Sequence, residues 1–168
     1  MSRIRLIKRI SIASIIIAVI LGVGGWLFWY LSQPIVPSAI RSKLPFSPLV
    51  YVGAEYKVSS YKYASEEKIF SYVIKDDSGN YITVAEQVQP PQFTDIPEYK
   101  DRFLDNVTRR YATVQSSGIT VYLTRPPKQA KQVGIIIDKG LLVFMSANKD
   151  LNEDQWRKIA DHLELERL

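Results

Sequence analysis

The chain has 168 residues, with 22 lysines and arginines against 17 aspartates and glutamates, one histidine and no cysteine. The lack of cysteine excludes a disulfide framework, a thiol nucleophile and a cysteine-based zinc site, and a single histidine excludes a multi-histidine metal centre. An apolar content of 46% excludes a disordered chain.

The net charge of +5 is concentrated at the N-terminus, where Arg3, Arg5, Lys8 and Arg9 stand without an acidic residue. From residue 34 onward the chain has 18 basic and 17 acidic side chains, a difference of +1. A nucleic-acid-binding domain needs a concentrated basic patch, which this balance does not provide. We therefore expect no nucleic acid among the partners.

The basic tail, residues 1–9, is followed by an uncharged run over residues 10–31, ISIASIIIAVILGVGGWLFWYL. A helix of this length spans about 33 Å, which matches a hydrocarbon core of about 30 Å. Because the basic residues precede the run, the positive-inside rule keeps the N-terminus cytoplasmic and exports the rest. We predict a single-pass signal anchor in the cell membrane that contacts the lipid bilayer from Ile10 to Leu31. A cleaved signal peptide is the alternative, but its apolar core would be only about 7–15 residues long.

Small residues recur at spacings of three and four within this run: Ser11, Ser14, Ala18, Gly22 and Gly25. Such a stripe lets two helices approach closely. In one interpretation the stripe is an interface for self-association or for an envelope protein partner, formed by Ser14, Ala18, Gly22 and Gly25. In the other, it is a chance alignment of small residues, which are common in membrane helices.

Residues 32–48 are predicted to form a stalk, because Pro34, Pro37, Pro45 and Pro48 disfavour helices and central strands. At about 3.1 Å per residue an extended stalk could hold the next domain up to about 45 Å from the bilayer. Residues 49–168 are numerous enough for one hydrophobic core.

Three strands are predicted in the first half of this domain. Residues 56–63 alternate loosely and are rich in tyrosine, valine and serine, whereas 68–75 and 81–89 have valine, isoleucine and tyrosine at alternate positions. Residues 76–80 (DDSGN) join the last two strands as a hairpin turn, because Asp, Asn and Gly tolerate positive φ. A calcium loop is a competing interpretation, but the glutamate that closes such a loop is missing.

A helix is predicted next, because the apolar period changes from two to 3.6. Its N-cap is Thr94 or Asp95, Pro97 lies in its first turn, and its apolar face is Ile96, Tyr99, Phe103, Leu104, Val107 and Tyr111. Strands follow at 112–115, 119–124, 131–138 and 141–146, with turns at Gly118 and Lys139-Gly140.

A last helix is predicted from about Asn152, with Asp150 and Glu153 as its capping box. Its buried face is Trp156, Ile159, Ala160 and Leu163. The order of elements predicts an α+β domain in which an antiparallel sheet carries two helices packed on one face.

Three segments between Tyr111 and Leu165 resemble an extracytoplasmic domain of the domain-of-unknown-function 4367 type: VQSSGITVYL, QVGIIIDKGLLVFMSA and LNEDQWRKIADHLEL. That domain follows a single membrane helix in bacterial anti-sigma-factor-like proteins and lipoproteins. The chain departs from the family at Ile135–Ile137, where a tryptophan is frequent, and residues 1–30 hold no cytoplasmic anti-sigma domain. The resemblance therefore implies an anchored extracytoplasmic domain, and no sigma-binding role or catalytic residue.

The residues that could carry chemistry have plainer interpretations. His162 is the only imidazole and no Gly-x-Ser-x-Gly elbow accompanies it, so we interpret it as a surface or helix-cap residue. Glu98, Asp101 and Asp105 interleave with lysines and arginines, which predicts a solvated, charged helix face. We expect no catalytic residue, no cofactor and no metal.

Tyrosines are the most unusual feature of the domain. Tyr51, Tyr56, Tyr61 and Tyr63 crowd one short stretch together with two lysines. Tyrosine is rigid and amphipathic, which suits protein or glycan surfaces, so these four form the candidate interaction surface. The other interpretation is that they cover an edge strand of the sheet.

These features predict a non-enzymatic binding or accessory domain, anchored in the cell membrane and exposed to the bacterial cell envelope. The alternative is a small anchored cell-wall or glycan hydrolase. Such an enzyme would need two carboxyl groups about 5–10 Å apart in a pocket.

Overall fold

The computed structural model describes residues 35–127 and 131–166. The chain divides into two compact units, residues 1–35 and 36–168, and the second is the folded domain considered below. The predicted membrane run and its small-residue stripe lie outside the described residues. Among the helices that are described, none has the length and apolar character needed to cross a membrane.

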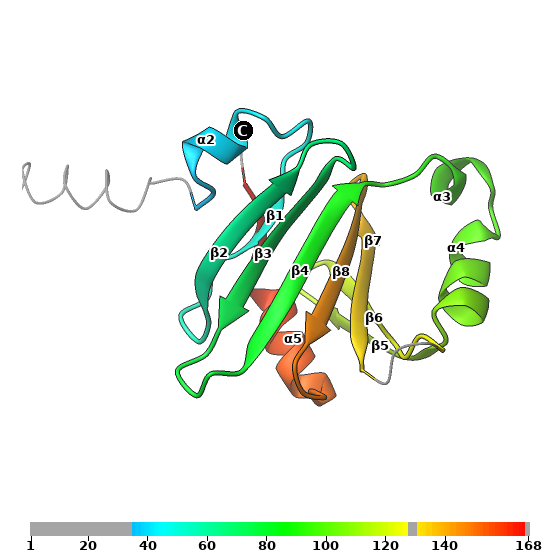
Figure 1. The fold of residues 1–168 in the computed structure, drawn as a ribbon. Helices are drawn as coiled ribbons and strands as arrows, with labels where there is room; N and C mark the ends of the chain where they lie inside the picture. Colours follow the sequence, from blue (N-terminus) through cyan, green and yellow to red (C-terminus); the bar gives the residue numbers. More distant parts are fainter. Residues whose placement is uncertain (1–34, 128–130, 167–168) are drawn as a thin grey trace, which may run out of the picture. The chain divides into compact units, whose positions relative to one another are not determined.

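The domain is built on a seven-stranded antiparallel sheet with the strand order β2-β3-β4-β8-β7-β6-β5 (Figure 1). Its strands are β2 (Lys57–Ala64), β3 (Ile69–Lys75), β4 (Tyr81–Val88), β5 (Arg110–Ser116), β6 (Ile119–Thr124), β7 (Val133–Asp138) and β8 (Leu141–Ala147). Each corresponds to a predicted strand, and the α+β class with an antiparallel sheet is confirmed.

The hairpin turns use positive φ where the sequence predicts it. Gly118 (φ +75°) turns β5 into β6, and Gly140 (φ +74°) turns β7 into β8. Between β3 and β4, the Asp76 carboxylate accepts a hydrogen bond from the backbone N–H of Asn80 at 2.8 Å. Residues 76–80 therefore form the expected hairpin turn, in which the aspartate satisfies the backbone.

A second sheet pairs β1 (Leu49–Tyr51) with β9 (Leu163–Leu165), antiparallel. This ribbon was not predicted, because strands of three residues are too short to show a period. Leu163 is buried as expected, but in β9 and not on a helix. The ribbon ties the beginning of the domain to its end.

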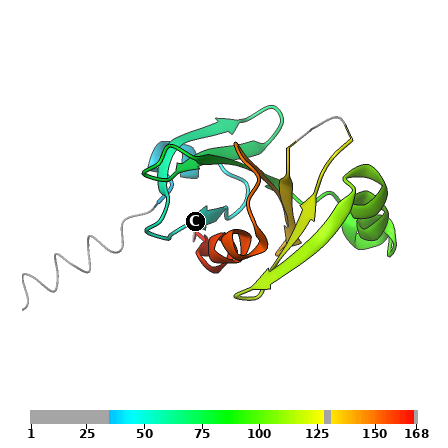
Figure 2. The same ribbon diagram turned by 90° about the horizontal axis from the view of Figure 1, so that it is seen from below.

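The large sheet has an inner face, which carries Gly134 and Ile136, and an outer face, which carries Ile135. Figure 2 shows the sheet bending around helix α5 (Glu153–Asp161), which lies on the inner face. There the Trp156 ring packs so closely on β7 that a Cβ on Gly134 would come within 2.9 Å of it.

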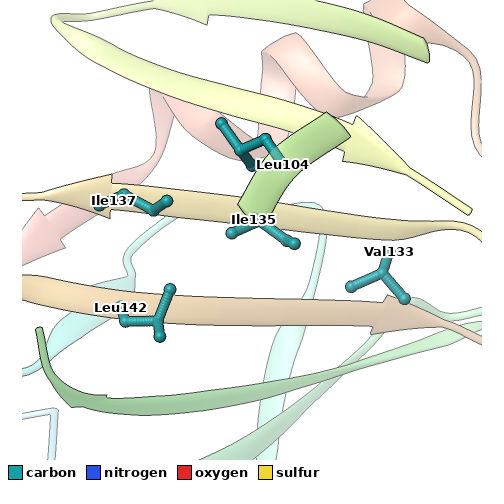
Figure 3. Close-up of a cluster of buried hydrophobic side chains, with 5 residues drawn as sticks. All are labelled: Leu104, Val133, Ile135, Ile137 and Leu142. Carbon is teal, nitrogen blue, oxygen red and sulfur yellow. The ribbon is translucent and has the colours of Figure 1, made fainter. Parts of the chain in front are cut away.

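The outer face is covered over β6, β7 and β8 by α3 (Gln92–Asp95), α4 (Tyr99–Arg102) and the π-helix η1 (Phe103–Val107). Leu104 of η1 is fully buried against side chains of β7 and β8 in the cluster Val133, Ile135, Ile137 and Leu142 (Figure 3). Helices therefore pack on both faces, and the prediction of two helices on one face is wrong. The first five residues of β7, VGIII, are apolar because the strand is buried on both sides.

The helix predicted from residue 96 is broken. Pro97 restricts the residue before it, and Ile96 is extended (φ −115°, ψ 106°), which separates α3 from α4. Thr94 and Asp95 lie inside α3 and cap nothing, and Glu98 is the N-cap of α4. Arg109 adopts a positive φ of 55°, and β5 begins at the next residue. Of the predicted apolar face, Leu104 alone is fully buried.

The last helix follows the prediction more closely. Its capping box joins Asn152 and Gln155, with both reciprocal hydrogen bonds at 2.9 Å, in place of the predicted Asp150 and Glu153. Asp150 instead pairs with Arg125 at 2.6 Å. Trp156, Ile159 and Ala160 are buried as predicted.

The predicted stalk is largely part of the domain. Val36, Leu44 and Phe46 are buried, and α2 (Ser38–Arg41) forms a short turn of helix between them. The backbone N–H of Val36 donates to the Glu166 carboxylate at 2.9 Å. The extended stalk over residues 32–48 is therefore wrong for residues 36–48, the docked segment, because its apolar side chains are buried against the domain.

Candidate functional site

An open pocket lies on the outer face of the large sheet. Ile69 of β3, Ala85 and Gln87 of β4, and Phe144 of β8 line it together with Glu86, and its volume is about 240 Å³. The strand register explains the arrangement, because Ala85 lies directly opposite Phe144 and side chains alternate between faces. We call this the outer pocket.

The surface around the outer pocket is polar. No helix among the described residues covers the outer face of β2, β3 and β4 (Figure 1). By register, this face carries Lys62 of β2, Ser71 of β3 and Thr83 of β4. The outer face therefore offers hydroxyl and ammonium groups beside an apolar hollow, a composition that is typical of ligand pockets.

Glu86 contributes only its backbone to the outer pocket, because its side chain points to the inner face. Glu86 is 1% exposed, and its carboxylate accepts a hydrogen bond from the backbone N–H of Leu49 at 2.8 Å. Its Oε1 has no hydrogen-bond partner among the described residues. Burial raises the pKa of Glu86 from 4.5 to about 8, against the opposing effect of the Leu49 N–H.

Tyr72 completes the contact with Leu49. Its hydroxyl donates to the Leu49 carbonyl at 2.9 Å, so side chains of β3 and β4 satisfy both backbone groups of Leu49. Burial, with a smaller effect of Glu86, raises the pKa of Tyr72 well above 10. Glu86 and Tyr72 therefore fix β1 on the inner face.

The four predicted tyrosines do not form one exposed surface. Tyr51 and Tyr56 are buried, 4% and 7% exposed, with their rings edge to face at 5.7 Å. Tyr61 and Tyr63 are half-buried in β2. Tyr61 lies stacked on Phe70 with ring centroids 6.2 Å apart. By register both face inward, so the interpretation that the tyrosines cover the sheet describes them better than a binding surface does.

His162 is the C-cap of α5 and is exposed, as predicted. Its Nδ1 lies 2.8 Å from the Lys158 carbonyl, so this nitrogen carries the proton. Nearby, Asp161 accepts hydrogen bonds from Ser116 and Ser117, the second at 2.8 Å. These bonds lower the pKa of Asp161. The serines donate to the carboxylate and not to the imidazole, so the group lacks the arrangement of a catalytic triad.

The acidic residues of α4 and η1 form ion pairs, as the charged-face prediction requires. Glu98 pairs with Arg102 at 3.0 Å, and Arg110 pairs with both Asp101 and Asp105. Metal-binding clusters of histidine, aspartate and glutamate are not formed within residues 35–127 and 131–166.

Two other hollows are formed by described residues. One, of about 210 Å³, lies against α4 and η1 and is lined by Tyr99, Arg102, Phe103, Asn106 and Val107. The other is small and is lined mainly by aliphatic side chains with Asp138 and Lys139. None of these three hollows is lined by two carboxylate residues, which a glycan hydrolase would require.

Comparison with protein families, with curated proteins and with solved structures returned no match for this chain.

Proposed function

We propose that the protein is a single-pass protein of the bacterial cell membrane whose exported domain binds another envelope molecule at the outer pocket, as a non-enzymatic accessory domain. The uncharged run from Ile10 to Leu31, with basic residues only before it, supports the anchor and the N-in, C-out orientation. The resemblance of Tyr111–Leu165 to an extracytoplasmic domain supports the same location.

The observation that carries the binding role is the lining of the outer pocket. Ile69, Ala85 and Phe144 offer apolar contacts, and the Gln87 amide can donate and accept hydrogen bonds. None of these side chains ionises or acts as a nucleophile. A sheet that presents such a pocket can hold an apolar group with one polar contact.

Photo-cross-linking in intact cells tests this role. A photoreactive residue in place of Gln87 should give a discrete adduct, and the same residue in place of Gln115 should not. Gln115 is a matched control, since it is an exposed glutamine on β5 at the opposite edge of the sheet. Ala85→Leu, which fills the pocket, should abolish the Gln87 adduct. An adduct that survives Ala85→Leu, or equal adducts at both positions, would contradict the proposal.

A further inference from the structure

The docked segment shortens the tether between the membrane and the domain. The sequence predicts a stalk that could hold the domain up to about 45 Å away. Val36 is 0% exposed, however, and its N–H is bound to Glu166, so the folded domain begins at this residue. Only residues 32–35 remain between the predicted span and Val36, and four residues reach at most about 14 Å when extended.

A tether of this length restricts which part of the domain can meet the membrane. A domain of this size has a radius of gyration of about 14 Å, which for a sphere corresponds to a diameter of about 36 Å, more than twice the reach of the tether. The surface next to Val36 must therefore stay close to the lipid headgroups, whatever the direction of the tether. This surface is formed by α2 and the residues that flank it, Pro37–Lys43, which we call the α2 surface.

The chemistry of the α2 surface suits an anionic bilayer. The docked segment carries Arg41 and Lys43 and no acidic residue. Lys43 is exposed, and the Arg41 side chain is 34% exposed while it lies 4.0 Å from Glu166. Basic side chains close to an anionic membrane surface are attracted to its headgroups. Ser38, Ala39 and Ser42 are exposed and small, so they allow close approach.

We propose that the α2 surface rests on the headgroups of the membrane that anchors the chain, with Arg41 and Lys43 directed to anionic lipids. This inference depends on the membrane anchor in the proposed function.

Lipid quenching of single fluorophores tests this proposal on the full chain. The protein has no cysteine, so Ser38→Cys on α2 and Asn106→Cys on η1 each give one labelling site. Both positions are exposed, and α2 and η1 lie at opposite ends of the domain (Figure 1). The labelled proteins are inserted into phosphatidylcholine–phosphatidylglycerol vesicles that contain a lipid with a nitroxide on its headgroup.

The label on residue 38 should be quenched several-fold more than the label on residue 106. Lys43→Glu should reduce quenching at residue 38 in these anionic vesicles and leave it unchanged in pure phosphatidylcholine. Equal quenching at both labels would overturn the proposal, provided that the protein floats with the vesicles and resists carbonate extraction. In that case the membrane anchor is still supported. Extraction of the protein by carbonate would overturn the membrane anchor itself. Unchanged quenching in Lys43→Glu would overturn the role of anionic lipids.

Discussion

Replacing the buried Glu86 with glutamine should stabilise the domain at neutral and alkaline pH. Glu86 is 1% exposed, and its carboxylate holds the backbone N–H of Leu49 at 2.8 Å while Oε1 has no partner among the described residues. Glutamine has the same shape and keeps an oxygen for the Leu49 N–H, but it never ionises. The substitution therefore removes the cost of a buried charge and preserves the contact with β1.

The size of the effect follows from the pKa. Burial raises the pKa of Glu86 from 4.5 to about 8, so the folded domain retains a proton that the unfolded chain releases. The free energy of unfolding should thus fall as the pH rises from about 4.5 to about 8, and then level off. At about 1.4 kcal/mol per pKa unit, the loss is about 3 kcal/mol at pH 7 and about 5 kcal/mol above pH 8. An unpaired amide group in the variant offsets about 1–3 kcal/mol of this gain.

Urea unfolding of residues 36–168 between pH 5 and pH 9 measures the effect, and Trp156 is the only tryptophan in this fragment. Wild type should lose stability across this range, whereas Glu86→Gln should be nearly flat and exceed wild type at pH 8. Glu67→Gln, in the exposed turn between β2 and β3, should keep the wild-type profile. Parallel profiles for wild type and Glu86→Gln would refute the burial argument.

Three further changes test the packing of the domain by urea unfolding. Deleting the docked segment should lower the free energy of unfolding by several kcal/mol, because each fully buried large apolar side chain contributes about 1.5–3 kcal/mol. Equal stability of the fragments 36–168 and 49–168 would show that residues 36–48 are a free stalk. Gly134→Ala should cost about 1–3 kcal/mol, because its Cβ would lie 2.9 Å from the Trp156 ring, and a neutral effect would mean that α5 is not docked there. Gln132→Leu should lower the free energy of unfolding by at least about 2 kcal/mol. The Gln132 amide accepts from the indole N–H of Trp156 at 2.8 Å and bonds with both backbone groups of Leu151. A loss of stability no larger than that of Gln115→Leu would contradict this role of Gln132.

The strands of the large sheet could be predicted because each carries its own local signal. Alternating side chains identify β3 and β4, and residues 76–80 and Gly118 supply the turns between strands. The docked segment and the β1–β9 ribbon carry no such signal. Leu49 pairs with Leu165 at the far end of the chain, and neither three-residue strand has a measurable period. Proline content alone predicts extension, and it does not reveal that Val36 is buried.

The candidate sites show the same division. A cluster of tyrosines in the sequence predicts an interaction surface. In the structure Tyr51 is buried, and the register of β2 places Tyr61 and Tyr63 on the inner face. The buried Glu86 could have been found, because it continues the apolar period of Ile82 and Val84 in β4. The outer pocket could not be found in this way, because it depends on the pairing of β4 with β8, which no local pattern specifies.

Labelling with a membrane-impermeant maleimide in intact cells tests whether the domain is exported behind a single anchor. One protein carries Ser78→Cys in the exposed turn between β3 and β4, and the other carries Ser2→Cys in the basic tail. Export of the domain predicts that Ser78→Cys is labelled in intact cells and that Ser2→Cys is labelled only after lysis. Protection of Ser78→Cys until lysis, with the protein present at full length, would contradict it.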